Sequence, residues 1–337
     1  MVRNLVTFRL VRFGAAFCTA TLLWHVGSPT AYSQYAQAAA AAPAAQPVVT
    51  NGQVVIQNAG ALPSAEAGIY TMAADGTQPR TLASVKETQW QGWPQWSHDG
   101  KRVAFEAWPN NAKGADTKVF VVSADGGEPK DLGIGKSPSW SADDKQIVFA
   151  VPRGSSETKN GTWIMNADGT GRQWLFSGGR PACSPDGSRI AFVNSVEGND
   201  KVFVYDLLTA EAQTVLAEDY LHVYGCAWSP DSKQICFVGN RRNSPVELAI
   251  IDAAGSDKFY KVRLTDNIGH NPNWAPGSRV LLWMVVDGVP RLHSIDPAGD
   301  EMPTRLDAQT ANQTNIDASW SPDGKRIVFS FNPNPGS

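Results

Sequence analysis

Runs of alternating apolar and polar residues recur along the chain, and tight polar turns join them in pairs. In the last copy, from Ala318 to Phe329, a Trp anchor precedes Ser-Pro-Asp-Gly and an alternating run that ends on an aromatic residue. Pro-Asp-Gly is typical of a tight turn, so each copy predicts a strand, a turn and a second strand. The six anchors stand at positions 96, 140, 183, 228, 274 and 320, which are 43 to 46 residues apart. A repeat of that length is typical of β-propeller blades.

A second strand pair follows each motif hairpin, and its first copy runs from Ile69 to Leu82 around an Asp-Gly turn. Six hairpins of each kind predict 24 strands, and therefore an all-β, six-bladed propeller with four-stranded blades. The chain opens on a second pair and ends on a motif hairpin at 318–331. We therefore expect both ends to complete one blade and close the ring, with the propeller at 69–331 and a tail at 332–337.

The repeated aromatic and acidic residues of the motif have structural explanations. Alternation along the strands places the motif tryptophans in the gaps between blades, where we expect them to form core. The motif aspartates stand in tight turns, where an Asp side chain bonds its own backbone. Each of these aspartates lies alone in its own blade, so we do not expect them to bind metal.

The first residues have the three-part form of a secretory signal. Arg3, Arg9 and Arg12 precede an apolar run at 13–27, and small residues at 36–38 or 31–33 offer a cleavage site. The run is short for a membrane span, so we expect 1–38 to be a cleaved signal peptide, with an uncleaved anchor as the alternative. An Ala- and Pro-rich linker with one short strand at 54–56 is expected at 39–68. These features predict a periplasmic or secreted protein with no membrane span in the mature chain.

The motif W-S-P-D-G-K-x-I-x-F, followed by I-Y-x-M-x-A-D-G, resembles the WD40-like (PD40) repeat of TolB-type propellers. The resemblance covers Ile69 to Phe331 and recurs six times, although the third copy has Cys183 for Trp and the fifth reads Ala-Pro-Gly-Ser at its turn. It implies a six-bladed propeller and an extracytoplasmic protein. TolB itself is a periplasmic component of the Tol–Pal envelope system. Related propellers also cover serine peptidases or act alone as lyases.

The net charge and the absence of certain motifs argue against several classes of function. A net charge of -3 and a pI near 6.0 argue against a nucleic-acid partner. The chain has no G-x-S-x-G elbow to expose a serine nucleophile. His222 and His270 stand on loops that enter adjacent blades and share one mouth of the channel, but a third metal ligand is not evident. We therefore expect no enzyme activity, no cofactor and no bound metal.

The loops at that mouth are unequal in length, whereas the turns at the opposite end are short and alike. Functional residues concentrate on variable loops held by a rigid scaffold. Exposed aromatic residues together with arginine are typical of protein-binding patches. The candidate binding residues are Trp90, Trp93, Trp108, Tyr220, His222, Tyr224, His270, Arg180, Arg241 and Arg242.

Three cysteines follow the leader. With Pro230-Asp231-Ser232 as the turn, Cys226 would lie opposite Cys236, and an oxidising compartment would permit a cross-strand disulfide. The alternative is two small buried thiols. Cys183 replaces a motif Trp, so we expect a buried free thiol there.

The sequence favours a non-catalytic scaffold that binds a protein or peptide partner, such as an envelope lipoprotein, at the loop-rich mouth. The alternative is a glycan-binding or metal-dependent polysaccharide lyase-like propeller that uses the same face. A lyase would require His222, His270 and a further ligand within reach of one metal ion, whereas a scaffold requires a broad mixed surface.

Overall fold

The computed structural model describes residues 67–74, 78–110, 116–157, 159–216, 218–255, 259–262, 271–275, 277, 279–286, 289–296, 304–305 and 315–331. Within these ranges the chain forms strands and turns, and no helix has the length and apolar character that crossing a membrane would require. The predicted signal peptide at 1–38, the strand at 54–56 and the tail at 332–337 lie outside the described residues.

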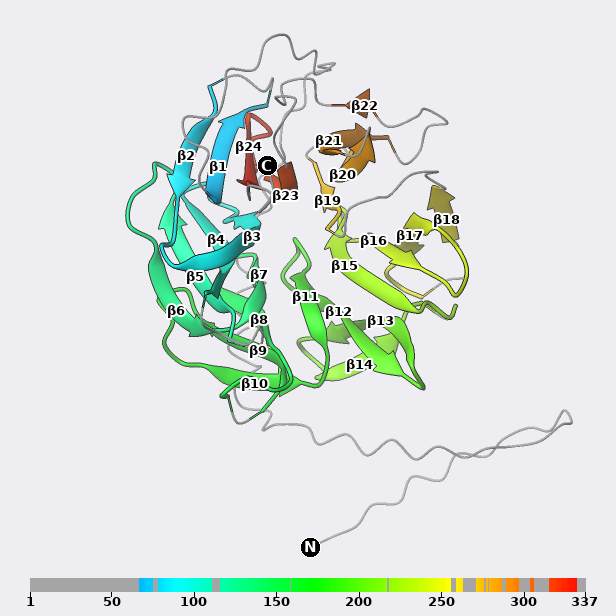
Figure 1. Cartoon of the computed structure of the whole chain (residues 1–337). Helices are drawn as coiled ribbons and strands as arrows, with labels where there is room; N and C mark the ends of the chain where they lie inside the picture. Colours follow the sequence, from blue (N-terminus) through cyan, green and yellow to red (C-terminus); the bar gives the residue numbers. More distant parts are fainter. Residues whose placement is uncertain are drawn as a thin grey trace, which may run out of the picture.

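Six four-stranded antiparallel sheets stand around a central axis, which confirms the predicted six-bladed propeller (Figure 1). Blade 1 contains β3 (Thr88–Trp96), β4 (Arg102–Pro109), β5 (Lys118–Ser123) and β6 (Lys130–Ile134); blade 2 contains β7 (Lys136–Trp140), β8 (Gln146–Val151), β9 (Gly161–Asn166) and β10 (Gln173–Phe176). Blade 3 contains β11 (Gly179–Cys183), β12 (Arg189–Val196), β13 (Asn199–Asp206) and β14 (Glu211–Thr214); blade 4 contains β15 (His222–Trp228), β16 (Gln234–Asn240), β17 (Val246–Asp252) and β18 (Phe259–Val262). Blade 5 contains β19 (Asn273–Trp274), β20 (Val280–Val286), β21 (Val289–Ile295) and β22 (Thr304–Arg305).

The sixth sheet, the closing blade, joins both ends of the propeller. Its strand order is β2 (Arg80–Ala83), β1 (Gly68–Ala73), β24 (Arg326–Phe331) and β23 (Asn315–Trp320). Strand β1 pairs with β24 along its whole length, from Gly68 opposite Phe331 to Ala73 opposite Arg326. The predicted closure of the ring by the two ends of the chain is therefore confirmed.

The core lies in the gaps between blades, as the alternation predicted. The aromatic residue that ends the motif is almost completely buried in five copies: Phe105, Phe149, Phe192, Phe237 and Phe329. Four motif tryptophans are buried as well, at positions 96, 140, 228 and 274. Burying one such side chain contributes about 1.5–3 kcal/mol, so the apolar gaps between blades are a main source of stability.

Glycine allows two of these rings to sit against the neighbouring backbone. A Cβ atom at Gly178 would lie 2.5 Å from a ring carbon of Phe192, and one at Gly135 would lie 2.5 Å from a ring carbon of Phe149. Gly178 also has a φ of 136°, which side-chain-bearing residues rarely adopt. In these two blades the buried phenylalanine therefore depends on a glycine placed fourteen residues before it.

The motif turns carry a repeated hydrogen-bond arrangement, which supports the prediction that their aspartates form the turns. The Ser229 hydroxyl donates to Asp231 at 2.6 Å and accepts from the Gln234 amide at 2.9 Å. The same bonds recur at Ser97, Ser141, Ser184 and Ser321. These turns lie at one end of the channel, which we call the turn end; the other end, where the inner strands begin, is the mouth.

An arginine after the turn ties each of several blades to the next. Arg102 donates to the Asp144 carbonyl at 2.7 Å and lies over the Trp140 ring, 4.5 Å from its centroid. Arg189 makes the same contacts with Ser232 and Trp228, at 2.6 Å and 4.8 Å. The motif therefore repeats the latch between blades as well as the blade itself.

The possible disulfide between Cys226 and Cys236 is not formed. Cys226 pairs with Phe237 and Cys236 with Ala227, one position away from the predicted register. Four residues, 230–233, separate the bonded pair Ser229 and Gln234, so the centre of the turn falls between Asp231 and Ser232. A slip of one residue moves a side chain to the other face of a strand, and all three described cysteines are free thiols, with Cys183 buried as expected.

Candidate functional site

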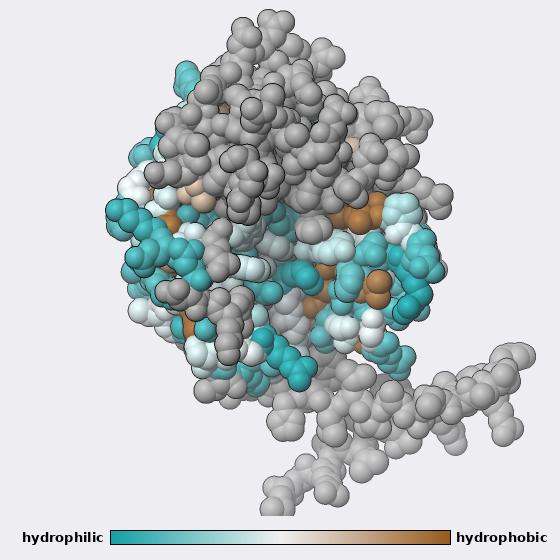
Figure 2. Space-filling model, in the orientation of Figure 1, coloured by the Kyte–Doolittle hydropathy of each residue, from teal (hydrophilic) through white to brown (hydrophobic). Residues whose placement is uncertain are grey.

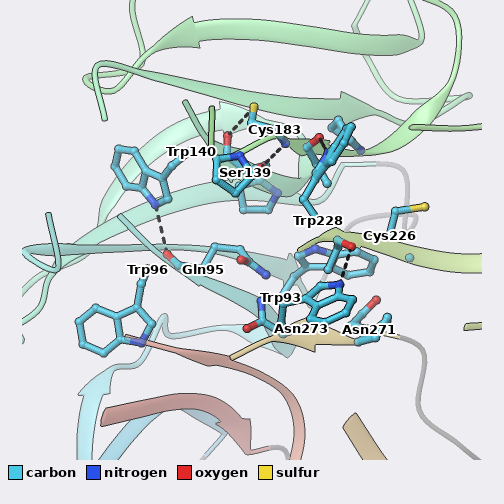
Figure 3. A pocket seen from close by; sticks show the side chains of 18 of the residues that line it. Trp93, Gln95, Trp96, Ser139, Trp140, Cys183, Cys226, Trp228, Asn271 and Asn273 are labelled. Atoms are coloured by element: carbon cyan, nitrogen blue, oxygen red, sulfur yellow. Dashed lines mark hydrogen bonds between the residues drawn. The ribbon is translucent and has the colours of Figure 1, made fainter. Parts of the chain in front are cut away.

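The innermost strands of the blades enclose the channel. A cavity of about 130 Å³ lies inside, and its wall includes Trp93, Trp140, Cys183, Cys226, Trp228 and Asn271 (Figure 3). Trp140 donates its indole N–H to the Gln95 carbonyl at 3.1 Å, and Trp228 donates to Ala182 at 2.8 Å. Bonds to the preceding blade thus fix the tryptophan walls of the cavity.

A ring of equivalent positions, three residues before each anchor, forms the neck of the channel. Four of them are non-glycine residues with left-handed backbone: Trp93 (φ 52°), Ser137 (51°), Arg180 (52°) and Asp317 (49°). Each lies at an irregularity of the innermost strand, where one extra residue breaks the pairing. Bulges of this kind redirect side chains and are frequent beside functional sites.

Two buried carboxylates lie at this neck. Glu106 is 3% exposed and accepts the Ser137 amide at 2.5 Å; burial is the main cause that raises its pKa to about 7. Asp317 is 5% exposed and accepts the Trp93 amide at 3.3 Å and the side-chain amide of Asn271. Burial raises the pKa of Asp317 to about 6. Carboxyl groups that titrate near neutral pH in a cleft are typical of functional sites.

Two cations stand beside these acids. Lys136 opens β7 directly before the Ser137 bulge, and Arg180 lies at the corresponding bulge of β11. Burial lowers the pKa of Lys136, the charge of Glu106 opposes that effect, and the charge of Arg180 adds to it. Adjacent blades therefore bring four ionisable groups of both signs to one place.

An aromatic pair forms part of the rim. Trp90 and Trp108 lie across β3 and β4 with ring centroids 5.8 Å apart and planes at 61°. Trp108 is 37% exposed, one of two large hydrophobic residues described as exposed. The Trp90 ring lies on Gly92, where a Cβ atom would come within 2.0 Å of it. The structure thus brings Trp90 and Trp108 together, while Trp93 lines the cavity.

The expectation that Tyr220 belongs to an exposed patch is wrong, and Arg241 beside it is engaged in ion pairs. Tyr220 is fully buried, and its hydroxyl donates to Glu247. Arg241 forms ion pairs with Glu218 at 3.0 Å and Glu247 at 2.9 Å. Backbone pairing of Tyr220 with Asp200 draws the ring inward, so these residues hold the loop before β15 in place.

The remaining candidates are spread over several places. His222 is exposed and its ring lies 6.0 Å from that of Tyr224, whose hydroxyl donates to Asn240 at 3.1 Å. Arg242 is exposed, and His270 lies outside the described residues. In the described part of the chain, no three His, Cys, Asp or Glu side chains gather as they would around a metal ion.

Sequence reasoning missed Glu106, Lys136, Asn271 and Asp317. One signal was present for Glu106, which is a lone charge in an otherwise apolar strand, Val103 to Trp108. The other three could be found only by aligning positions relative to the anchors. Among the described residues that Figure 2 shows in colour, hydrophilic side chains predominate and hydrophobic ones form small separate patches. The coloured part of that surface is mixed rather than broadly apolar.

Comparisons with known proteins agree with this fold. A family model described as the PD40 TolB beta propeller domain matches residues 155–335. The chain is 25% identical over 240 residues to the Tol-Pal system protein TolB of Francisella tularensis subsp. mediasiatica, covering 68% of this chain and 54% of that protein. It therefore spans about half the length of the curated relatives it matches.

Two solved structures have the same architecture. The putative TolB from Agrobacterium tumefaciens gives a TM-score of 0.64 at 16% identity, with 80% of this chain and 100% of that chain covered. TolB from Acinetobacter baumannii gives 0.54 at 18% identity, with 70% and 67% covered. At these identities the likeness establishes the fold.

Proposed function

Because the chain belongs to the TolB beta propeller family, we propose that it is a non-catalytic, extracytoplasmic propeller whose mouth binds a protein partner. The relatives named Tol-Pal system protein support a protein partner in an envelope assembly. Together with the predicted signal peptide, they support a periplasmic location. An envelope lipoprotein is the partner we favour.

The observation that carries the proposal is the Trp90–Trp108 pair at the rim. An exposed tryptophan on a rigid hairpin is the kind of residue that dominates the energy of a protein interface. Gln91 holds this hairpin through its side-chain amide, which accepts the Val85 amide at 3.0 Å and donates to the Thr88 hydroxyl at 3.1 Å. The pair is therefore presented in one orientation, which lowers the entropic cost of binding.

Affinity capture from detergent-solubilised envelope tests the proposal. The full chain serves as bait beside Trp90→Ala/Trp108→Ala, with Leu208→Ala as the matched control. Leu208 is 75% exposed and lies in the turn between β13 and β14, at the turn end. We expect one protein to be retained by the wild type and by Leu208→Ala, and to be lost with the tryptophan variant.

Equal capture by all three baits would contradict a role for the rim. Recovery of no protein, together with stoichiometric metal in the purified chain, would contradict the scaffold function. That second outcome would favour the lyase-like alternative, which requires a metal ion at the same mouth.

A further inference from the structure

Lys136 and Arg180 occupy related places on neighbouring innermost strands. Both are half-buried, and each adjoins a bulge at the neck of the channel. The residues that follow them, Pro138 and Ser139 in β7 and Pro181 and Ala182 in β11, line the cavity. Because the inner strands begin at the mouth, the two cations lie on the mouth side of these cavity-lining residues.

Neither cation has a direct partner among the described residues. In the described part of the chain, the side chains of Lys136 and Arg180 make no ion pair within 4.0 Å and no hydrogen bond. Other half-buried cations are paired: Arg172 contacts Glu157 at 3.0 Å, and Lys201 contacts Asp219 at 2.5 Å. The two cations at the neck therefore differ from Arg172 and Lys201 in having no acidic partner in contact.

Two half-buried charges of the same sign are costly when they lie close together without a counter-ion. The groups that face them are Glu106 from β4, Asp317 beside Glu106 from β23, and Cys226 from β15 beside Arg180. Of these, Glu106 is the acid whose charge acts on the pKa of Lys136, and burial raises the pKa of Glu106 itself to about 7. When Glu106 takes up its proton, the protein offers the two cations less negative charge.

We propose that Lys136 and Arg180 form an anion site in the neck of the channel, and that it receives a side-chain carboxylate of an acidic peptide segment. The inference rests on the proposed function, because it specifies the chemistry of the protein partner. An arginine fork matches the two oxygens of a carboxylate, and a lysine adds a second charge. Trp90 and Trp108 at the rim, with Trp93 in the cavity wall, would contact the apolar residues of the same segment.

Binding of a fluorescein-labelled peptide of six glutamates to the full chain, followed by fluorescence anisotropy at low salt, tests the site. We expect Lys136→Gln/Arg180→Gln to weaken binding by about tenfold or more, as expected for losing charge-assisted hydrogen bonds. The matched control is Lys101→Gln/Lys233→Gln, which removes the same charge at the turn end. It should bind within about twofold of wild type, since screened charges at a distance contribute little.

The pH dependence gives a second, independent readout. Ionisation of Glu106 adds a negative charge beside Lys136, so affinity should fall as the pH rises from 6 to 8. Glu106→Gln should remove most of this fall and bind more tightly than wild type at pH 8. Arg180→Lys keeps the positive charge and should retain more affinity than Arg180→Gln. Because both variants remove the same guanidinium group, the comparison isolates the contribution of the charge.

Equal binding by wild type and the Lys136/Arg180 double variant would overturn the site, and so would absence of binding to the glutamate peptide. Binding of trigalacturonate, but not of the peptide, would overturn the peptide assignment in favour of an acidic glycan. Capture of a partner that needs Trp90 and Trp108 but not Lys136 and Arg180 would leave the proposed function standing and refute this inference alone.

Discussion

The two ends of the channel use carboxylates in opposite ways. At the turn end, partial burial opposes ionisation, but hydrogen bonds from a serine and a backbone amide lower the pKa of Asp99, Asp143, Asp186 and Asp323. At the mouth, burial dominates and raises the pKa of Glu106 and Asp317. The repeated acids stabilise the fold when charged, whereas the unrepeated acids are held at a cost.

This difference separates residues that build the propeller from residues that distinguish it. A position that recurs from blade to blade must satisfy the same local geometry each time, and the Ser–Asp turn does so in five blades. A position that differs from blade to blade is free to carry strain or buried charge. The buried carboxylates of Asp317 and Glu106 belong to this second class, because the equivalent positions of other blades carry other side chains.

The largest expected effect compares two tryptophans. Trp140→Ala should lower the free energy of unfolding by about 4 kcal/mol, because it empties a buried site and removes the contacts with Gln95 and Arg102. Trp108→Ala at the mouth should cost less than about 1 kcal/mol, since this side chain is exposed. Urea unfolding of both variants measures the two losses in free energy of unfolding. Equal losses would contradict the view that Trp140 stabilises the fold while Trp108 is free to serve binding.

Glu106→Gln should change how stability depends on pH. A carboxyl whose pKa is raised from 4.5 to about 7 on folding keeps its proton longer in the folded state, so stability falls as the pH rises from about 4.5 to 7. The full effect is about 3 kcal/mol, and the glutamine should remove it. Unfolding curves at pH 5 and pH 8 measure the difference; an unchanged pH profile would show that Glu106 is not buried in its acid form.

Asp144→Gly tests a second contact between blades 1 and 2, which the Asp144 side chain makes beside the Arg102 latch. The Asp144 carboxylate accepts the backbone amides of His98 and Asp99, each at 2.7 Å, and its φ of 59° suits glycine, which occupies this place in other copies. Losing both bonds without backbone strain should cost about 2 kcal/mol. Thermal unfolding beside Ser232→Gly, which removes one comparable bond from Asp186 at 3.1 Å, should show the smaller loss in the control.

Ser229→Ala should give the smallest effect, about 1 kcal/mol, because it removes one hydroxyl from a single turn. The Ser229 hydroxyl is the largest cause of the lowered pKa of Asp231. The variant should therefore also raise the pKa of Asp231, as followed by NMR titration of its carboxyl. A pKa that stays unchanged would indicate that backbone amides alone hold this turn.

Regular spacing made the fold predictable, because each local signal was repeated six times and agreed with the others. The Trp anchor, the Ser–Asp turn and the closing aromatic residue identify strands, and their order identifies the closing blade. The disulfide prediction failed on a single residue of register in the turn after Trp228. The predicted exposure of Tyr220 was wrong because an isolated backbone bridge to Asp200 buries the side chain, and no local sequence pattern indicates such a bridge.

The sequence predicted less of the site than of the fold, and the reason is geometric. Glu106, Lys136, Arg180 and Asp317 come from four blades, and consecutive members of this set are 30, 44 and 137 positions apart along the chain. Bulges place Arg180 and Asp317 at the neck, and the ring of blades brings Glu106 and Lys136 beside them. Bulges leave no clear sequence signal when the residue is not glycine. Arg180 was identified as a candidate because it stood near aromatic loops, and its nearness to Lys136 depends on the ring.

The closing blade has a consequence for how the protein is made. The Thr71 hydroxyl donates to the Ile327 carbonyl at 3.1 Å, across 256 positions of sequence. Strand β1 therefore lacks its partner β24 until the residues of that strand, at the other end of the propeller, have been synthesised. A prematurely terminated product lacking β24 would keep an open, adhesive edge that proteases and chaperones recognise. Closure of the ring therefore distinguishes a propeller that includes β24 from a truncated one.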